Sequence, residues 1–228
     1  MSKNILVTGA SRGIGEQIVN EFSKNENYTI YALSRNVERM HKSFNGLVNV
    51  HPYKLDLCQN IQSQIQPILN KIDSIDILVN NAGLLIKKPF NEITKNDLIE
   101  SYQVNVFGII ESIQLCLNHF KKNTHILNIS SMGGFQGSVK FPELTAYSSS
   151  KAAICNVTEM FAEEYKNSGI KINCLCLGAI QTEMLKKAFP DFNASINANE
   201  MAKYICDFAE NGHRFYNGAV LPVSLSTP

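Results

Sequence analysis

The sequence has 228 residues, of which 44% are hydrophobic and 18% charged, and its formal net charge is +1. These values predict one globular domain over residues 1–228 that buries most of its apolar surface. The near-zero charge and the scattered basic residues argue against a nucleic-acid-binding protein. No apolar run approaches the ~20 residues that span a bilayer. The N-terminal residues lead directly into a strand pattern, so we expect no secretion signal, no membrane partner and a cytoplasmic location.

The six cysteines form no Cys-x-x-Cys pair, and the five histidines show no ligand spacing. We therefore expect buried free thiols in a reducing compartment and no metal site. The cysteines are Cys58, Cys116, Cys155, Cys174, Cys176 and Cys206.

Short apolar runs alternate with amphipathic segments along the whole chain. In chain order, strands are expected at residues 4–8, 28–34, 48–55, 76–80, 124–130, 171–177 and about 219–223. Helices are expected at 13–24, 61–72, 96–121, 146–167 and 199–210, with a short helical segment before the third strand and an irregular segment at 178–198. This alternation predicts an α/β fold: a Rossmann-like, doubly wound parallel sheet of about seven strands with helices on both faces.

A glycine-rich turn lies between the first expected strand and the first expected helix. Glycines let a backbone turn approach phosphates closely, and the free N–H groups of a helix N-terminus attract the anion. The turn therefore predicts a dinucleotide-binding site. Its candidate binding residues are Gly9, Ser11, Arg12, Gly13, Ile14 and Gly15.

The end of the second expected strand indicates which dinucleotide binds. A carboxylate at that place would hold an adenosine 2′-hydroxyl and repel a 2′-phosphate. This chain has Ser34 and Arg35 there, Arg12 in the glycine turn, and Glu38 only beyond the strand end. Two guanidinium groups and a hydroxyl suit a 2′-phosphate, so we predict NADP(H) rather than NAD(H). The alternative is that both arginines are merely solvated.

Tyr147 and Lys151 are one helical turn apart at the start of an expected helix. A phenol can give or take a proton, but its ordinary pKa of about 10 makes it slow near neutral pH. A lysine on the same helix face brings a positive charge that favours the phenolate, so we expect Lys151 to lower the pKa of Tyr147.

Several motifs occur together in an order that resembles the short-chain dehydrogenase/reductase family, in its NADP-preferring type. The likeness covers almost the whole chain. The matching motifs are the turn from Thr8 to Gly15, Asn80–Asn81–Ala82–Gly83 after the fourth strand, Asn105, Ser131 after the fifth strand, the pair Tyr147 and Lys151, and the loop from Gly178 to Thr182.

The resemblance implies a role for each matching residue. Tyr147 would exchange a proton with the substrate oxygen, Ser131 (rather than Ser130) would hydrogen-bond that oxygen, and Lys151 would lower the tyrosine pKa. Asn105 would hold a water that links Lys151 to solvent. The implied cofactor-binding residues, besides those of the glycine turn and Ser34 and Arg35, are Asp56, Leu57, Asn81, Ala82, Gly83, Tyr147, Lys151, Gly178, Ile180 and Thr182.

The expected activity is NADP(H)-dependent reduction of a small-molecule ketone or aldehyde, or the reverse oxidation. The alternative is a non-catalytic NADP(H) sensor or partner-binding protein on the same fold. The loop at 133–145 carries Phe135, Phe141 and Pro142 and favours a bulky or apolar substrate, but the sequence does not name it. Relatives pair their long helices across a two-fold axis, so we expect a homodimer or homotetramer.

Overall fold

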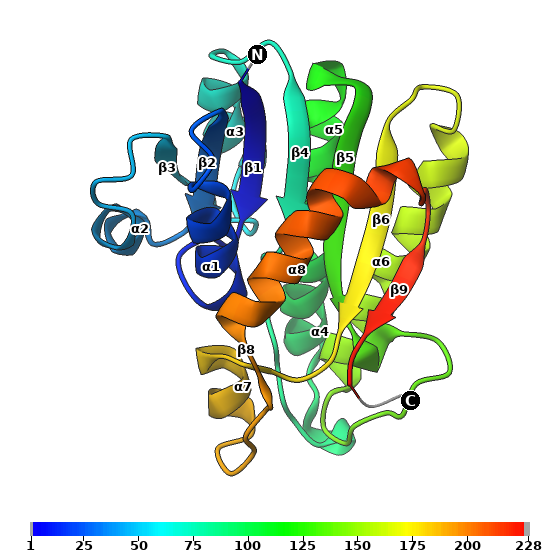
Figure 1. The fold of residues 1–228 in the computed structure, drawn as a ribbon. Helices are drawn as coiled ribbons and strands as arrows, with labels where there is room; N and C mark the ends of the chain where they lie inside the picture. The colour runs from blue at the N-terminus through cyan, green and yellow to red at the C-terminus, as the bar shows by residue number, and fades with distance from the viewer. Residues whose placement is uncertain (1, 226–228) are drawn as a thin grey trace.

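A seven-stranded parallel sheet forms the centre of the computed structural model, which describes residues 2–225 (Figure 1). The strand order is β3-β2-β1-β4-β5-β6-β9. The strands are β1 (Lys3–Thr8), β2 (Tyr28–Ser34), β3 (Val50–Lys54), β4 (Ile75–Asn80), β5 (Phe120–Ser131), β6 (Lys171–Leu177) and β9 (Val220–Val223). This confirms the predicted Rossmann-like doubly wound sheet.

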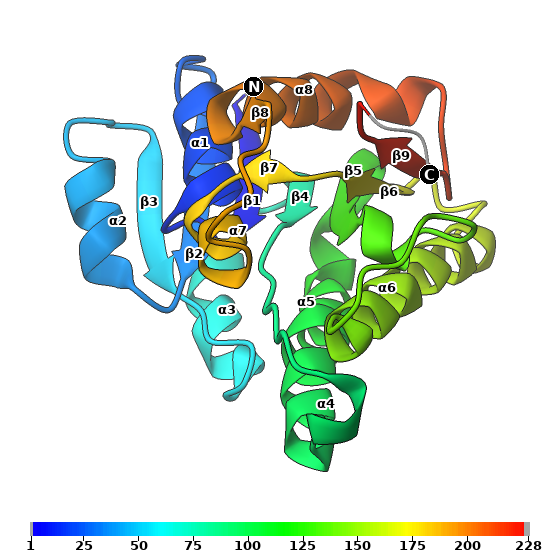
Figure 2. The same ribbon diagram turned by 90° about the horizontal axis from the view of Figure 1, so that it is seen from below.

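Helices cover both faces of the sheet (Figure 2). Helices α1 (Gly13–Phe22) and α8 (Ala198–Asn211) pack together on one face, while α3 (Ile61–Leu69), α5 (Gly108–Cys116) and α6 (Thr145–Glu164) pack on the other. Helix α2 (Val37–Ser43) lies beside β3 at the sheet edge, and α4 (Lys95–Tyr102) packs against α6. No helix within residues 2–225 combines the length and apolarity that crossing a membrane requires.

Side-chain alternation along β1 divides the core into two layers. Ile5 and Val7 belong to the cluster that contains Ile18 of α1, whereas Leu6 belongs to the cluster that contains Ile65 of α3. Successive strand residues point to opposite faces, so a strand covered on both sides needs apolar residues at consecutive positions. This requirement explains the nearly continuous apolar runs in the sequence.

The strand order reverses direction at β1, where β2 follows on one side and β4 on the other. Crossover helices leave such a point towards opposite faces, so a crevice opens at the carboxyl ends of the two strands. Asn81 closes the base of this crevice. Its Nδ2 donates to Thr8 O at 3.1 Å and to Gly9 O at 3.3 Å, and its N–H donates to Thr8 Oγ1.

The single helix expected at 96–121 is interrupted. Helix α4 ends at Tyr102, a π-helical turn runs over Gln103–Phe107, and α5 ends at Cys116 before a 3-10 turn at Leu117–His119. The apolar spacing of the segment does not reveal a one-residue bulge, because the residues on both sides keep helical periodicity. Strand β5 also begins earlier than predicted, at Phe120.

The irregular segment expected at 178–198 contains short elements. Strands β7 (Ile180–Gln181) and β8 (Ile196–Asn197) pair in parallel, and α7 (Glu183–Ala188) lies between them. Thr182 caps the N-terminus of α7, because its side chain accepts a hydrogen bond from Leu185 N. The segment from β7 to the end of α7, residues 180–188, lines the crevice, and we call it the flap.

Candidate active site

The glycine turn joins β1 to α1 in a conformation that needs glycine. Gly9 has φ +69°, and a Cβ built there would lie 2.8 Å from Ala82 Cα. A Cβ on Gly15 would lie 2.3 Å from Gly9 O. Arg12 precedes α1 and makes no side-chain cap, so the first N–H groups of the helix remain available. This arrangement forms a cradle for a phosphate group.

The two arginines predicted to hold a 2′-phosphate come from different loops: Arg35 follows β2, and Arg12 lies in the glycine turn before α1. Ser34 Oγ donates to Ser11 Oγ at 2.8 Å, and Arg35 is exposed beside them. Arg12 Nη1 lies 3.3 Å from Glu183 Oε2. Arg39 of α2, which the sequence reasoning did not select, pairs with the same carboxylate at 2.6 Å. The structure therefore gathers three guanidinium groups at this end of the crevice.

Ser131 and Tyr147 meet at the opposite end of the crevice. Ser131 ends β5 and Tyr147 lies in the first turn of α6, and a hydrogen bond joins their side chains. Ser130 points the other way, because its Oγ donates to Lys151 O at 2.8 Å. The alternation of the strand thus places Ser131, not Ser130, beside the tyrosine.

Lys151 is buried, with 3% of its surface exposed, and its Nζ donates to Ile129 O at 2.8 Å. Nζ lies 6.0 Å from the centroid of the Tyr147 ring. Burial lowers the pKa of Lys151 to about 8, because the ammonium loses solvation. The lysine is therefore on the predicted face and close to the tyrosine.

The expected depression of the tyrosine pKa is not found in the protein alone. Burial raises the pKa of Tyr147 above its ordinary value, and the hydrogen bond with Ser131 lowers it only in part. The Lys151 ammonium is directed to the carbonyl of Ile129 instead of the phenol oxygen. Our prediction from helical spacing was wrong on this point because it neglected desolvation, which here exceeds the effect of a charge several ångströms away.

Asn105 lies in the π-helical turn, fully buried behind the crevice. Its Nδ2 donates to Leu84 O and to Ser150 Oγ, both at 2.9 Å, and its Oδ1 accepts from Leu84 N at 2.8 Å. A Cβ on Gly83 would lie 3.3 Å from Lys151 Nζ and 3.5 Å from Asn105 Oδ1. Asn105 thus anchors the loop after β4. Lys151 Nζ and Asn105 Oδ1 both lie beside Gly83, the small residue at the start of that loop.

One cavity of about 710 Å³ connects the glycine turn to Tyr147. Most of the predicted site residues line it. Gly15 and Asn105 do not, because Gly15 lies beneath the turn and Asn105 lies behind Leu84. The predicted residues that line the cavity are Gly9, Ser11, Arg12, Gly13, Ile14, Ser34, Arg35, Asp56, Leu57, Asn81, Ala82, Gly83, Ser131, Tyr147, Lys151, Gly178, Ile180 and Thr182.

The part of the cavity near Tyr147 is mainly apolar. Its walls come from the loop after β4, the loop after β5 and the flap that contains α7. Phe141 lines this region as expected, but Phe135 does not, because it packs against the buried core beneath α6. The apolar lining residues are Leu84, Leu85, Val139, Phe141, Leu144, Met184, Leu185, Phe189 and Phe192.

Sequence reasoning missed Arg39 and Glu183. Arg39 lies in α2, four residues after Arg35, so a search extended into that helix could have found it. Glu183 lies 171 residues from Arg12 and 144 residues from Arg39, and no local pattern connects them.

The sheet, the glycine cradle and the paired tyrosine and lysine define a dinucleotide-binding oxidoreductase. A family model described as short chain dehydrogenase matches residues 3–193. The chain belongs to the short-chain dehydrogenase/reductase family, which confirms the resemblance found in the sequence.

Several characterised proteins are similar to this chain. Oxidoreductase UcpA of Salmonella typhimurium is 32% identical over 213 residues, which cover 89% of this chain and 80% of UcpA. L-2,3-butanediol dehydrogenase of Corynebacterium glutamicum is 32% identical over 81% of this chain and 74% of its own length. The solved structure of ElxO with NADP bound superposes with a TM-score of 0.84 at 31% identity and covers 98% of each chain. A tyrosine-to-phenylalanine variant of ElxO was solved with NADPH bound.

Proposed function

We propose that this protein is an NADPH-dependent reductase of a small apolar ketone or aldehyde, with Tyr147 as the proton donor. The observation that carries the proposal is the single cavity that joins a phosphate cradle and the guanidinium groups of Arg12 and Arg35 to the hydrogen-bonded pair Ser131 and Tyr147. The similarity to ElxO, whose structure holds NADP, supports the choice of cofactor.

The residues present fit the proposed cofactor. The close approach of Gly9 and Gly15 to neighbouring backbone leaves room for no side chain, so the cradle is kept open for phosphate oxygens. Arg12 and Arg35 would hold the 2′-phosphate, since a guanidinium binds phosphate through charge-assisted hydrogen bonds. Tyr147 and Lys151 would contact the nicotinamide ribose. Bound NADPH supplies the hydride, and the protein supplies orientation and the proton.

The proton chemistry follows from the contacts of Tyr147. Negative charge develops on the substrate oxygen during reduction, and the Tyr147 hydroxyl can transfer a proton to it. Burial keeps the phenol protonated, which suits a donor. The Ser131 hydroxyl can donate a hydrogen bond to the same oxygen and hold it in place. In the reverse direction, Tyr147 would have to lose its proton first, and Lys151 would stabilise the phenolate.

The apolar lining near Tyr147 supports the substrate class. The wall near Tyr147 includes the apolar side chains of Leu84, Val139, Phe141 and Met184. A charged or highly hydroxylated substrate would lose hydration there without gaining partners, whereas an apolar carbonyl compound would gain from burial.

The direct test is NADPH consumption with a panel of carbonyl compounds that differ in charge and size. We expect turnover with apolar ketones or aldehydes and little with carboxylated or polyhydroxylated ones. Binding of NADPH without turnover of any compound would contradict the proposal and favour the non-catalytic alternative.

The choice of cofactor has its own test. In Arg35→Ala we expect the Kd for NADPH to rise about 10-fold, which corresponds to the loss of one charge-assisted hydrogen bond. The Kd for NADH should not change, because NADH has no 2′-phosphate. Arg214→Ala is a matched control, since Arg214 lies in a 3-10 turn away from the cavity. An equal effect on both nucleotides would contradict the assignment.

A further inference from the structure

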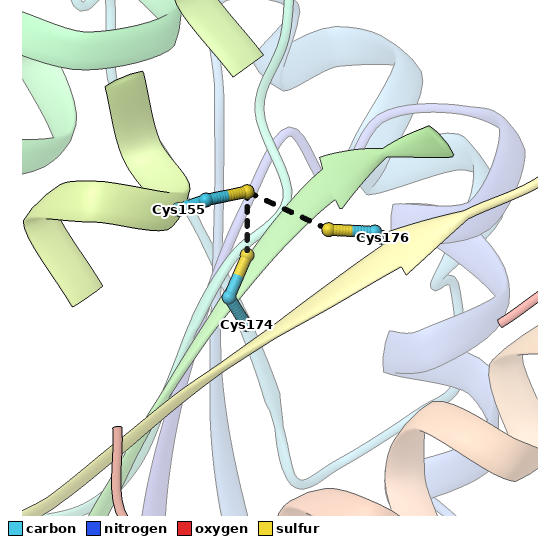
Figure 3. Close-up of side chains that lie close together, drawn as sticks. All are labelled: Cys155, Cys174 and Cys176. Atoms are coloured by element: carbon cyan, nitrogen blue, oxygen red, sulfur yellow. Dashed lines mark hydrogen bonds between the residues drawn. The ribbon is translucent and has the colours of Figure 1, made fainter. Parts of the chain in front are cut away.

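Three cysteines meet between α6 and β6 (Figure 3). Cys174 and Cys176 lie two residues apart on β6, so their side chains share one face of the strand. Cys155 lies on α6, which packs against that face. Cys155 Sγ is 3.5 Å from Cys176 Sγ and 4.0 Å from Cys174 Sγ, and the three sulfurs all lie within 4.8 Å of one another.

These separations match the spacing of thiolates around one metal ion. A metal–sulfur distance of about 2.3 Å places sulfurs about 3.8 Å apart in a tetrahedral site and about 4.0 Å apart in a planar trigonal one. The two sulfur–sulfur distances from Cys155, 3.5 and 4.0 Å, span these values. Cys155 could therefore share one ion with Cys174 and Cys176 without movement of the backbone. All three thiols are buried, with exposed fractions of 9%, 0% and 0%.

The surroundings suit a divalent ion. Three thiolates and one divalent cation carry a net charge of −1, which is costly to bury without a partner. The Lys151 ammonium lies within electrostatic reach of all three sulfurs and offers the compensating charge. Ser130 Oγ, 3.4 Å from Cys155 Sγ, lies between the cluster and the cavity that it also lines. Ser130 therefore marks an entry path and a candidate for the fourth ligand.

We propose that Cys155, Cys174 and Cys176 form a binding site for a thiophilic divalent d10 cation of the Zn²⁺ class. Thiolate ligands select soft ions of this kind. On binding, each thiol loses its proton to solvent and its sulfur lone pair bonds the metal, so three protons are released for each ion and no redox step occurs. The proposal does not depend on the proposed reductase activity.

Ordinary packing is the competing explanation, because a free cysteine behaves as a small apolar residue. Cys116 and Cys206 are buried without another cysteine sulfur beside them, and both are fully explained in this way. The two explanations differ in whether the reduced protein binds one metal ion per chain at these three cysteines.

The test is titration of the reduced, purified protein with Cd²⁺, whose thiolate complexes absorb in the near ultraviolet, followed by Zn²⁺ competition. We expect one Cd²⁺ per chain, displacement by Zn²⁺, and one bound ion in native mass spectrometry. Cys155→Ser and Cys174→Ser should lose the stoichiometric absorption, whereas Cys58→Ser and Cys206→Ser should keep it. No stoichiometric binding, or binding that requires Cys58, would overturn the proposal.

A second measurement needs no variant and remains valid if a substitution prevents folding. Saturation of the native protein with Cd²⁺ should protect Cys155, Cys174 and Cys176 from alkylation in brief denaturant pulses, as mapped by peptide mass spectrometry. Cys116 and Cys206 serve as internal controls, because they are buried but have no neighbouring thiol. If each of these five cysteines were alkylated to the same extent with Cd²⁺ as without it, the result would contradict the site.

Discussion

Lys151 shows how a residue to which we assign a role in the proposed reaction can oppose folding. Its ammonium is buried and makes one hydrogen bond, to the carbonyl of Ile129. Burial lowers its pKa from 10.5 to about 8. A shift of this size corresponds to about 3 kcal/mol of unfavourable free energy when the side chain is charged. The protein thus keeps a destabilising charge beside Tyr147, the residue that we propose exchanges a proton with the substrate.

We therefore expect Lys151→Met to increase the free energy of unfolding at pH 7 by about 2 kcal/mol, after the loss of about 1 kcal/mol for the hydrogen bond to Ile129. Urea unfolding measures this change, and carbonyl reduction should be lost in the same variant. Lys166→Met is the control, because Lys166 is exposed in a pair with Glu163 and its removal should change stability little. A destabilised Lys151→Met would contradict this interpretation of the buried charge.

The contribution of Lys151 to the free energy of unfolding depends on pH with a definite sign. The folded-state pKa of Lys151 lies below the unfolded value, so the unfolded chain binds more protons between about pH 8 and 10.5. The cost of burial is fully present below pH 8 and disappears as the pH rises through this window. We expect the stability difference between the wild type and Lys151→Met to shrink from pH 8 to pH 10, and a constant difference would contradict the assignment.

At the scale of elements, α7 is tied to the cofactor end of the crevice by one side chain. Glu183 begins α7 and pairs with Arg12 of the glycine turn and with Arg39 of α2. Of these two arginines, Arg12 also lines the cavity and is one of the residues proposed to hold a 2′-phosphate. On the proposed function, Glu183 would compete with the cofactor for Arg12, and its release would free α7 over the substrate region.

In Glu183→Gln we expect tighter NADPH binding, by about three-fold, because each exposed ion pair is worth only about 0–1 kcal/mol. The Kd for NADH should be unchanged, and isothermal titration calorimetry measures both. Glu38→Gln is a matched control, since Glu38 is exposed on α2 and does not line the cavity. Weaker NADPH binding in Glu183→Gln would show that the carboxylate does not compete.

The sequence predicted the sheet, its helices and the ends of most elements because apolar periodicity and turn residues are local signals. Strand β6 was predicted with the observed bounds, and so was β2. The π-helical turn around Asn105 was not predicted, because a bulge leaves the apolar periodicity of the flanking helices intact. Contacts between distant residues were not predicted either. The pairing of Glu183 with two arginines and the contact of Cys155 with β6 depend on how helices pack on strands, and no spacing in the sequence encodes this packing.

In the whole molecule, one group of exposed apolar side chains lies on three neighbouring elements, which are α4, the π-helical turn and α6. Ile99 of α4, Phe107 of the π-helical turn and Met160 of α6 are about half or more exposed, and α4 packs beside α6. Apolar side chains gathered on one side of a molecule often mark an interface. This surface is consistent with the homodimer or homotetramer that we expect from the sequence.

We expect sedimentation velocity to give at least twice the mass of one chain for the wild type, and Phe107→Glu to shift the protein towards the monomer, because a charge in a symmetric interface meets its own copy. Val48→Glu is the control, since Val48 is also exposed but lies in the loop between α2 and β3. A monomeric wild type would contradict the expectation.

On our proposal Tyr147 gives the proton in a carbonyl reduction, and the turnover of Tyr147→Phe is the decisive measurement. With the best compound of the panel, we predict that kcat falls on the order of 100-fold or more while NADPH still binds. Tyr165→Phe, which removes a hydroxyl from a tyrosine stacked on Phe161, should leave kcat unchanged. Undiminished turnover in Tyr147→Phe would contradict the proposed role of Tyr147.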